Sequence, residues 1–140
     1  MNNYVVGFIF SRDKSNILLI RKERPSWQVG KFNGVGGKIE QGEMPDTAIK
    51  RECTEETGMV ITSWVYKGII SGPSYSVCVF TAEATIDAML IAQSHPTDEP
   101  CKVFHINELD HVHTISQLRW LVPLLLDKEV IDIQIIQKDK

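Results

Sequence analysis

The chain has 140 residues, of which 43% are hydrophobic and 24% charged, and its formal net charge is −3 at pH 7. This length fits one domain over residues 1–140, and the composition is ordinary for a soluble globular protein. The weak negative charge excludes a general attraction to nucleic acid or to anionic membranes, so any polyanion must be bound by local charges. No apolar run approaches the ~18 residues of a membrane helix and the N-terminus lacks a signal-peptide pattern, so we expect a cytoplasmic protein without membrane partners.

The first part of the chain predicts two neighbouring strands and a cationic segment. Tyr4–Phe10 and Ile17–Ile20 are apolar runs separated by a polar, turn-rich cluster, which is typical of adjacent strands. Arg21–Arg24 follows and contains three cations. Such a run is commonly a solvated strand end, and the alternative is that Arg21 or Arg24 binds substrate phosphate.

A glycine-rich segment, Asn33–Lys38, comes next. Its three glycines in four residues match neither the phosphate-binding Walker loop nor the dinucleotide-binding fingerprint. We expect these glycines to let the backbone bend tightly and approach a ligand closely. Lys38 is the cation placed beside the following acidic helix.

Pro45–Thr57 predicts a helix of three turns, with a proline at its first position and Gly58 after its last residue. Glu52, Glu55 and Glu56 are spaced at i, i+3 and i+4, so their carboxylates crowd one face and repel one another. They also lie in the last turns, where the helix dipole disfavours negative charge. Mg²⁺, or Mn²⁺, would remove this cost because clustered hard oxygen ligands suit these ions. The alternative is a solvated acidic helix end.

The second half of the chain predicts a sheet with one further long helix. Ile86–Ser94 fits either a strand or a short helix, and Ser116–Lys128 is an expected helix in which Pro123 should produce a kink or a shortened start. The segments expected to be strands, the last of them at an edge, are Ser63–Ser71, Tyr75–Ala84, Lys102–Ile106 and Val130–Ile136.

The residues from Gly37 to Met59 resemble the signature of the Nudix hydrolases. Their spacing matches that signature throughout, with Cys53 and Met59 as unusual residues at its two aliphatic positions. A chance match of the fixed residues is on the order of one in a million at average residue frequencies. These fixed residues are Gly37, Glu43, Arg51, Glu52, Glu55, Glu56 and Gly58.

The resemblance implies an α/β Nudix fold, in which a mixed β-sheet is sandwiched between helices (α/β/α). It also implies metal-dependent hydrolysis of a nucleoside diphosphate linked to another moiety X. Arg51 is expected to orient the carboxylates, and Lys38 is expected to assist the departing phosphate. One carboxylate of the helix is expected to be the general base. The residues implied at the metal site are Glu52, Glu55, Glu56, Glu99 and Gly37.

Within the family, Gly30–Lys38 and Pro123–Leu126 most resemble the oxidised-purine nucleoside triphosphatases related to MutT. This implies a (d)NTP such as 8-oxo-dGTP as the substrate, cleaved to the monophosphate and pyrophosphate. Asn33 and Gln117 are expected to border the base, and Glu99 to lie near the metals.

The resemblance also leaves other family activities open. One alternative is hydrolysis of ADP-ribose or dinucleoside polyphosphates, because Pro73 and Tyr75 lie where the family distinguishes these enzymes, although both also fit a plain hairpin. Another is a non-catalytic nucleotide sensor. We expect a small-molecule nucleotide as ligand, no nucleic acid as partner, and a monomer or homodimer.

Overall fold

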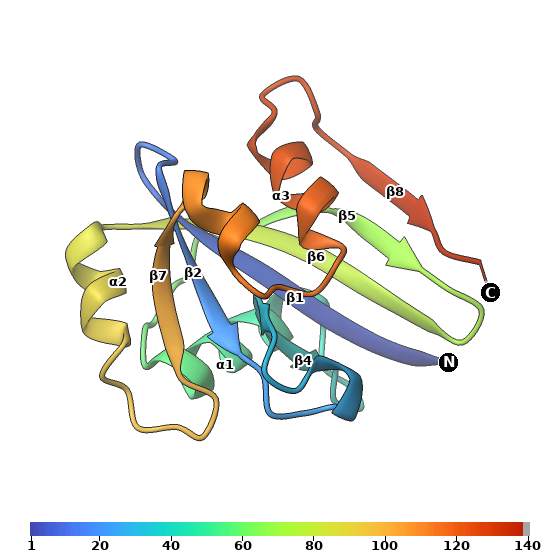
Figure 1. Cartoon of the computed structure of the whole chain (residues 1–140). Helices are drawn as coiled ribbons and strands as arrows, with labels where there is room; N and C mark the ends of the chain where they lie inside the picture. The colour runs from blue at the N-terminus through green and yellow to red at the C-terminus, as the bar shows by residue number, and fades with distance from the viewer. Residues whose placement is uncertain (139–140) are drawn as a thin grey trace.

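The computed structural model describes residues 1–138, which form an eight-stranded mixed sheet with helices on both of its faces (Figure 1). The strands are β1 (Asn2–Ser11), β2 (Asn16–Arg21), β3 (Phe32–Asn33), β4 (Val35–Lys38), β5 (Val65–Ser71), β6 (Tyr75–Ala84), β7 (Cys101–His105) and β8 (Ile133–Ile136). The helices are α1 (Pro45–Thr57), α2 (Ile86–Ala92) and α3 (Leu118–Leu126), with 3₁₀ turns η1 (Ser26–Gln28) and η2 (Ile106–His111). No helix in residues 1–138 is long and apolar enough to span a membrane.

Strand β1 is the centre of the sheet, whose order is β3-β2-β1-β6-β5-β8, with β4 paired to β1 and β7 to β2. It pairs in parallel with β6 along its length and antiparallel with β2 and β4. Every residue from Val5 to Ser11 is buried, as expected of a strand covered on both faces. The two first predicted strands are therefore confirmed as neighbours, and β8 is confirmed at an edge, beside β5.

The alternation of side chains along β1 divides the core into two layers. Val6 and Phe8 pack with α3 on one face, whereas Val5 and Ile9 pack with α1 on the other. In Figure 1, α3 lies in front of the sheet and α1 behind it. This arrangement confirms the predicted α/β class, with a mixed sheet between helices.

The prediction that the glycine-rich segment bends was wrong, because Val35–Lys38 is the extended strand β4. It pairs with β1, and Gly36 lies opposite Val6. A Cβ atom on Gly36 would fall 2.1 Å from the carbonyl oxygen of Val5. Glycine is therefore needed here so that the backbone of β4 can approach β1 closely, and not for a turn.

The remaining elements follow the sequence with two refinements. Ile86–Ala92, for which the pattern fitted either a strand or a helix, is helical, and the Thr85 side chain caps it by accepting a hydrogen bond from the Ala88 N–H. Helix α3 spans Leu118–Leu126, two residues shorter at each end than expected, and Pro123 lies inside it and does not mark its start.

Candidate active site

A cavity of about 810 Å³ lies between α1, β1 and the start of α3. One part of its wall, which we call the carboxylate end, consists of the acidic residues Glu52, Glu55, Glu56, Asp98 and Glu99 together with Lys22 and Arg24. Another part, which we call the amide end, consists of Tyr75, Gln117 and Gln137. The wall also includes apolar side chains of the α3-facing core, namely Val6, Phe8, Ile70, Ile115, Leu118 and Leu121.

Helix α1 presents one face to the core and another to this cavity. It begins at a proline and ends at Gly58, whose left-handed conformation and N–H bond to the Thr54 carbonyl close the last turn. The carboxylates of Glu52, Glu55 and Glu56 line the cavity. The residues that are buried on the neighbouring face are Ala48, Ile49, Cys53 and Thr57.

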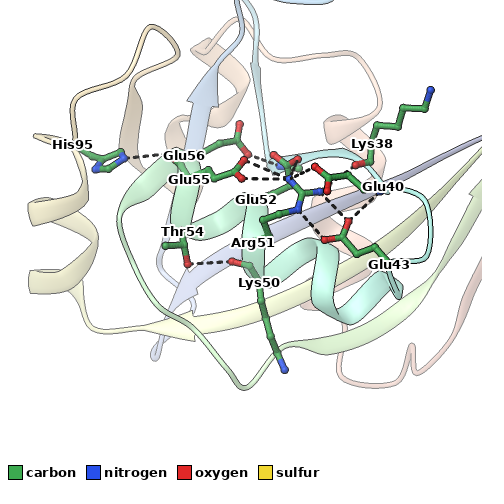
Figure 2. Close-up of polar contacts among 11 residues, drawn as sticks. Lys38, Glu40, Glu43, Lys50, Arg51, Glu52, Thr54, Glu55, Glu56 and His95 are labelled. Atoms are coloured by element: carbon green, nitrogen blue, oxygen red, sulfur yellow. Dashed lines mark hydrogen bonds and ion pairs between the residues drawn. The ribbon is translucent and has the colours of Figure 1, made fainter.

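Arg51 holds the carboxylates of this region together (Figure 2). Its Nε and Nη2 donate to the two oxygens of Glu43 at 2.8 and 2.9 Å, and its Nη1 donates to Glu52 Oε1 at 2.9 Å. Nη1 also lies 3.4 Å from Glu55 Oε2. Hydrogen bonds from Arg51 hold the pKa of Glu43 at about 2. A single guanidinium therefore offsets the repulsion between Glu52 and Glu55 that the sequence predicts on this helix.

Two glycines of β4 bring backbone directly against the glutamates of α1. The Gly36 N–H donates to Glu56 Oε1 at 2.8 Å, and a Cβ on Gly37 would lie 2.6 Å from Glu52 Oε1. Burial nevertheless raises the pKa of Glu56 to about 8 and raises the pKa of Glu52. In the metal-free protein at neutral pH, Glu56 is therefore mostly protonated.

The chemistry of these groups fits a divalent cation. The donors are carboxylate and backbone oxygens, and the burial that raises the pKa of Glu52 and Glu56 is a cost that a neighbouring positive ion would remove. As the side chains lie, no three acidic, histidine or cysteine residues among residues 1–138 are gathered closely enough to enclose an ion. Binding would require the carboxylates to converge, and Glu55, whose side chain is 58% exposed, has room to move.

Glu99, which the resemblance places at the metal site, is buried beside the α1 glutamates. It accepts hydrogen bonds from the backbone N–H groups of Glu23 and Arg24 at 2.7 and 3.3 Å. Its Oε1 also lies 3.4 Å from Lys22 Nζ and 3.2 Å from Arg24 Nη1. The loop that carries Glu99 is thus fixed to the end of β2 at the cavity wall.

Sequence reasoning missed Lys22, although it singled out both neighbouring arginines. The Lys22 side chain is only 11% exposed and lines the cavity, whereas Arg21 is half exposed and pairs with Glu23 at 3.3 Å. The alternation of side chains along β2 could have indicated that Lys22 points to the cavity. Leu18 and Ile20 face α1, and Lys22 continues their two-residue spacing.

The other predicted site residues divide into those in the cavity and those outside it. Arg24, Asn33 and Gln117 line it, and Asn33 donates to Gln28 Oε1 at 3.1 Å. Arg21 and Lys38 are not among the described residues of its wall. Figure 2 shows the Lys38 side chain pointing away from the glutamates, while its carbonyl accepts a hydrogen bond from Arg51 at 3.3 Å. The role predicted for Lys38 remains a prediction.

Comparison with known proteins places this geometry in a family. The family model for the NUDIX domain matches residues 1–133. Among solved structures, a MutT protein from Aliivibrio salmonicida or Vibrio cholerae is 23% identical, with 89% of this chain and 96% of that chain covered and a TM-score of 0.70. MutT from Bacillus halodurans is 20% identical, with 99% of this chain and 90% of that chain covered and a TM-score of 0.71.

The NUDIX domain of NrtR from Shewanella oneidensis, solved with ADP ribose, is 15% identical to this chain. The match covers 86% of this chain and 83% of that chain, with a TM-score of 0.70. NrtR has also been solved with a 27mer DNA, so the expectation that this chain has no nucleic-acid partner remains a prediction. At these identities, the structural likeness shows the fold.

Proposed function

This chain belongs to the NUDIX family, and we propose that it is a pyrophosphohydrolase that cleaves a (d)NTP to the monophosphate and pyrophosphate. The observation that carries the proposal is the single cavity that joins a carboxylate end to an apolar wall and a neutral amide end. The carboxylate end suits a cation and a polyphosphate, and the apolar wall with the amide end suits a base. The volume of about 810 Å³ lies within the range of small-molecule sites.

We assign the cation site to the glutamates of α1 together with Glu99 and the backbone of Gly37, and we propose Mg²⁺, with Mn²⁺ as a substitute. When bound, the ion would neutralise phosphate charge and lower the pKa of a water molecule for attack. Lys22 and Arg24, both beside Glu99, supply positive charge for the substrate phosphates. Arg51 fixes the orientation of Glu52 and Glu55, and one carboxylate of the group accepts the proton of the attacking water.

For the substrate, a purine triphosphate such as 8-oxo-dGTP is our first candidate. The segments Gly30–Lys38 and Pro123–Leu126 support it, and so do Asn33 and Gln117, which line the cavity. The second candidate is an ADP-ribose or dinucleoside polyphosphate. A specific observation favours it, because Tyr75 lines the cavity as well.

The decisive experiment measures release of pyrophosphate, phosphate and AMP from a panel of substrates. The panel contains (d)NTPs, 8-oxo-dGTP, ADP-ribose, NADH and dinucleoside polyphosphates, each with Mg²⁺ and with EDTA. We expect Mg²⁺-dependent pyrophosphate release from at least one (d)NTP. AMP release from ADP-ribose alone would support the second candidate. No release from any compound, together with tight nucleotide binding by calorimetry, would show a sensor and overturn the proposal.

A further inference from the structure

The amide end of the cavity is assembled from three distant segments. Gln137 follows β8, and its backbone N–H donates to the Ser71 carbonyl at 2.7 Å, so the chain continues along β5 beyond the strand. The Oε1 atom of Gln137 accepts a hydrogen bond from the Tyr75 hydroxyl and another from Gln117 Nε2 at 3.3 Å. Tyr75 begins β6 and Gln117 precedes α3. Gln137 is therefore the residue that connects the other two.

These hydrogen bonds fix which groups remain free. Because Gln137 Oε1 accepts from two donors, its Nε2 must point elsewhere, and because Gln117 donates through Nε2, its Oε1 must also point elsewhere. Neither Gln137 Nε2 nor Gln117 Oε1 has a hydrogen-bond partner within residues 1–138. The pair thus retains one amide donor and one amide acceptor at the cavity wall.

The distribution of charge along the cavity determines which part of a nucleotide each end can bind. Of the described residues in its wall, the lysines and arginines are Lys22 and Arg24, and both lie beside Glu99. The amide end contains uncharged groups only, and the buried side chains of Phe8 and Leu121 continue the wall. A phosphate has no counter-charge there, whereas a flat ring with hydrogen-bonding edges suits both features.

We propose that Gln137 is a specificity-determining residue that binds the base of the substrate. Its amide N–H and the Gln117 carbonyl together bind a base edge that presents an acceptor beside a donor, as side-chain amides do with adenine in nucleic-acid recognition. The hydrogen bond from the Tyr75 hydroxyl to Gln137 Oε1 favours this orientation of the amide. A flipped amide would present its donor and its acceptor to the base in exchanged positions. The inference rests on the proposed function and adds the group that selects the base.

The test is calorimetric titration of the full chain with the four nucleoside monophosphates and with inorganic pyrophosphate. In Gln137→Ala, we expect the preferred monophosphate to bind about tenfold more weakly and the preference among bases to shrink. Gln137→Glu should behave similarly, because a carboxylate still accepts from Tyr75 but has no donor. Pyrophosphate affinity should not change. Gln134→Ala, at an exposed position of β8, is the matched control and should bind as the wild type does.

Kinetics give a second readout. With a (d)NTP, Gln137→Ala should raise KM about tenfold and leave kcat nearly unchanged, and Tyr75→Phe should weaken selection among bases. If Gln137→Ala and Gln137→Glu both fold, as judged by thermal melting, and retain wild-type affinity and base preference, the inference is wrong. An equal loss of pyrophosphate affinity would also overturn it, because the role would then be structural. A wild type that binds monophosphates through Gln137 yet hydrolyses nothing would support the inference and refute the proposed activity.

Discussion

The two ends of the cavity are built in opposite ways. The carboxylate end takes three glutamates from one helix, and Arg51 in the same helix orients two of them. The amide end takes Tyr75, Gln117 and Gln137 from three segments that the sheet and α3 bring together. The carboxylate end is charged, and its three helix glutamates are local in sequence, whereas the amide end is neutral and is assembled from distant segments.

This difference indicates a division of labour within one cavity. Charged groups stabilise a transition state, so their loss lowers kcat, whereas neutral hydrogen-bonding groups act mainly on substrate affinity. Variants at the carboxylate end should therefore slow turnover without changing base preference, and variants at the amide end should do the reverse.

The largest effect is expected from replacing one carboxylate of the carboxylate end by an amide. Glu55→Gln and Glu56→Gln should each lower kcat by at least ~100-fold, because a neutral amide binds a divalent cation poorly. Both variants should fold, since Glu55→Gln relieves repulsion on α1 and the buried Glu56 is already mostly neutral in the metal-free protein. Steady-state kinetics and thermal melting check this, with Glu129→Gln, at an exposed position, as the control. Near-wild-type activity in both variants would refute the site assignment.

Arg51→Lys should have the next largest effect, about 10- to 100-fold in kcat/KM together with a lower Tm. An ammonium cannot maintain the two parallel bonds to Glu43 while also bonding Glu52. Lys50→Ala, whose side chain is exposed on the same helix, is the control. If Arg51→Lys changed base preference instead of turnover, the separation between the two ends would fail.

The acidic helix of the carboxylate end could be predicted from the sequence because its determinants are local. The bounds of α1, Pro45–Thr57, match the prediction, since a proline, a glycine and the helical period mark them within one short stretch. The hairpin of β5 and β6 and the edge position of β8 also match the prediction.

Other features escaped prediction because they depend on strand pairing. The glycine-rich segment is a strand because β1 lies beside it, and Gly36 is needed for contact with Val5. Lys22 rather than Arg21 faces the cavity because of the register of β2. Gln137 reaches Gln117 through pairing of β8 with β5. Sequence spacing carries no direct information on these long-range contacts.

Stability against pH should also distinguish the two ends. Burial raises the pKa of Glu56 from 4.5 to about 8 in the folded protein, so between these values the folded state keeps a proton that the unfolded state has released. The free energy of unfolding of the metal-free protein should therefore fall as pH rises from 6 to 8, by roughly 2 kcal/mol from this group.

This pH dependence is measured by denaturant unfolding in EDTA for wild type, Glu56→Gln and Gln137→Ala. The decrease should be smaller in Glu56→Gln, which cannot ionise, and unchanged in Gln137→Ala. An identical profile for wild type and Glu56→Gln would show that Glu56 does not carry the proton.

The smallest effect concerns oxidised against unmodified purines. In the human oxidised-purine enzyme of the family, two adjacent aspartates precede the Pro-Leu-Leu-Leu segment, and this chain has Gln117 and Leu118 there. We predict that dGTP competes well with 8-oxo-dGTP, so that their kcat/KM values differ by less than about 100-fold. Steady-state kinetics with both nucleotides measure this ratio.

The physical reason lies in the groups that face the base. A carboxylate pair can share a proton and so donate or accept as the base requires. Gln117 instead donates to Gln137 at 3.3 Å, and Leu118 is a buried apolar side chain, so this edge has one fixed hydrogen-bonding pattern. An unmatched group on a buried base costs roughly 1–3 kcal/mol, which limits how far a fixed edge can adapt to the oxidised ring. A kcat/KM for 8-oxo-dGTP a thousandfold above that for dGTP, on the order of 4 kcal/mol, would show that residues other than Gln117 and Leu118 select the base.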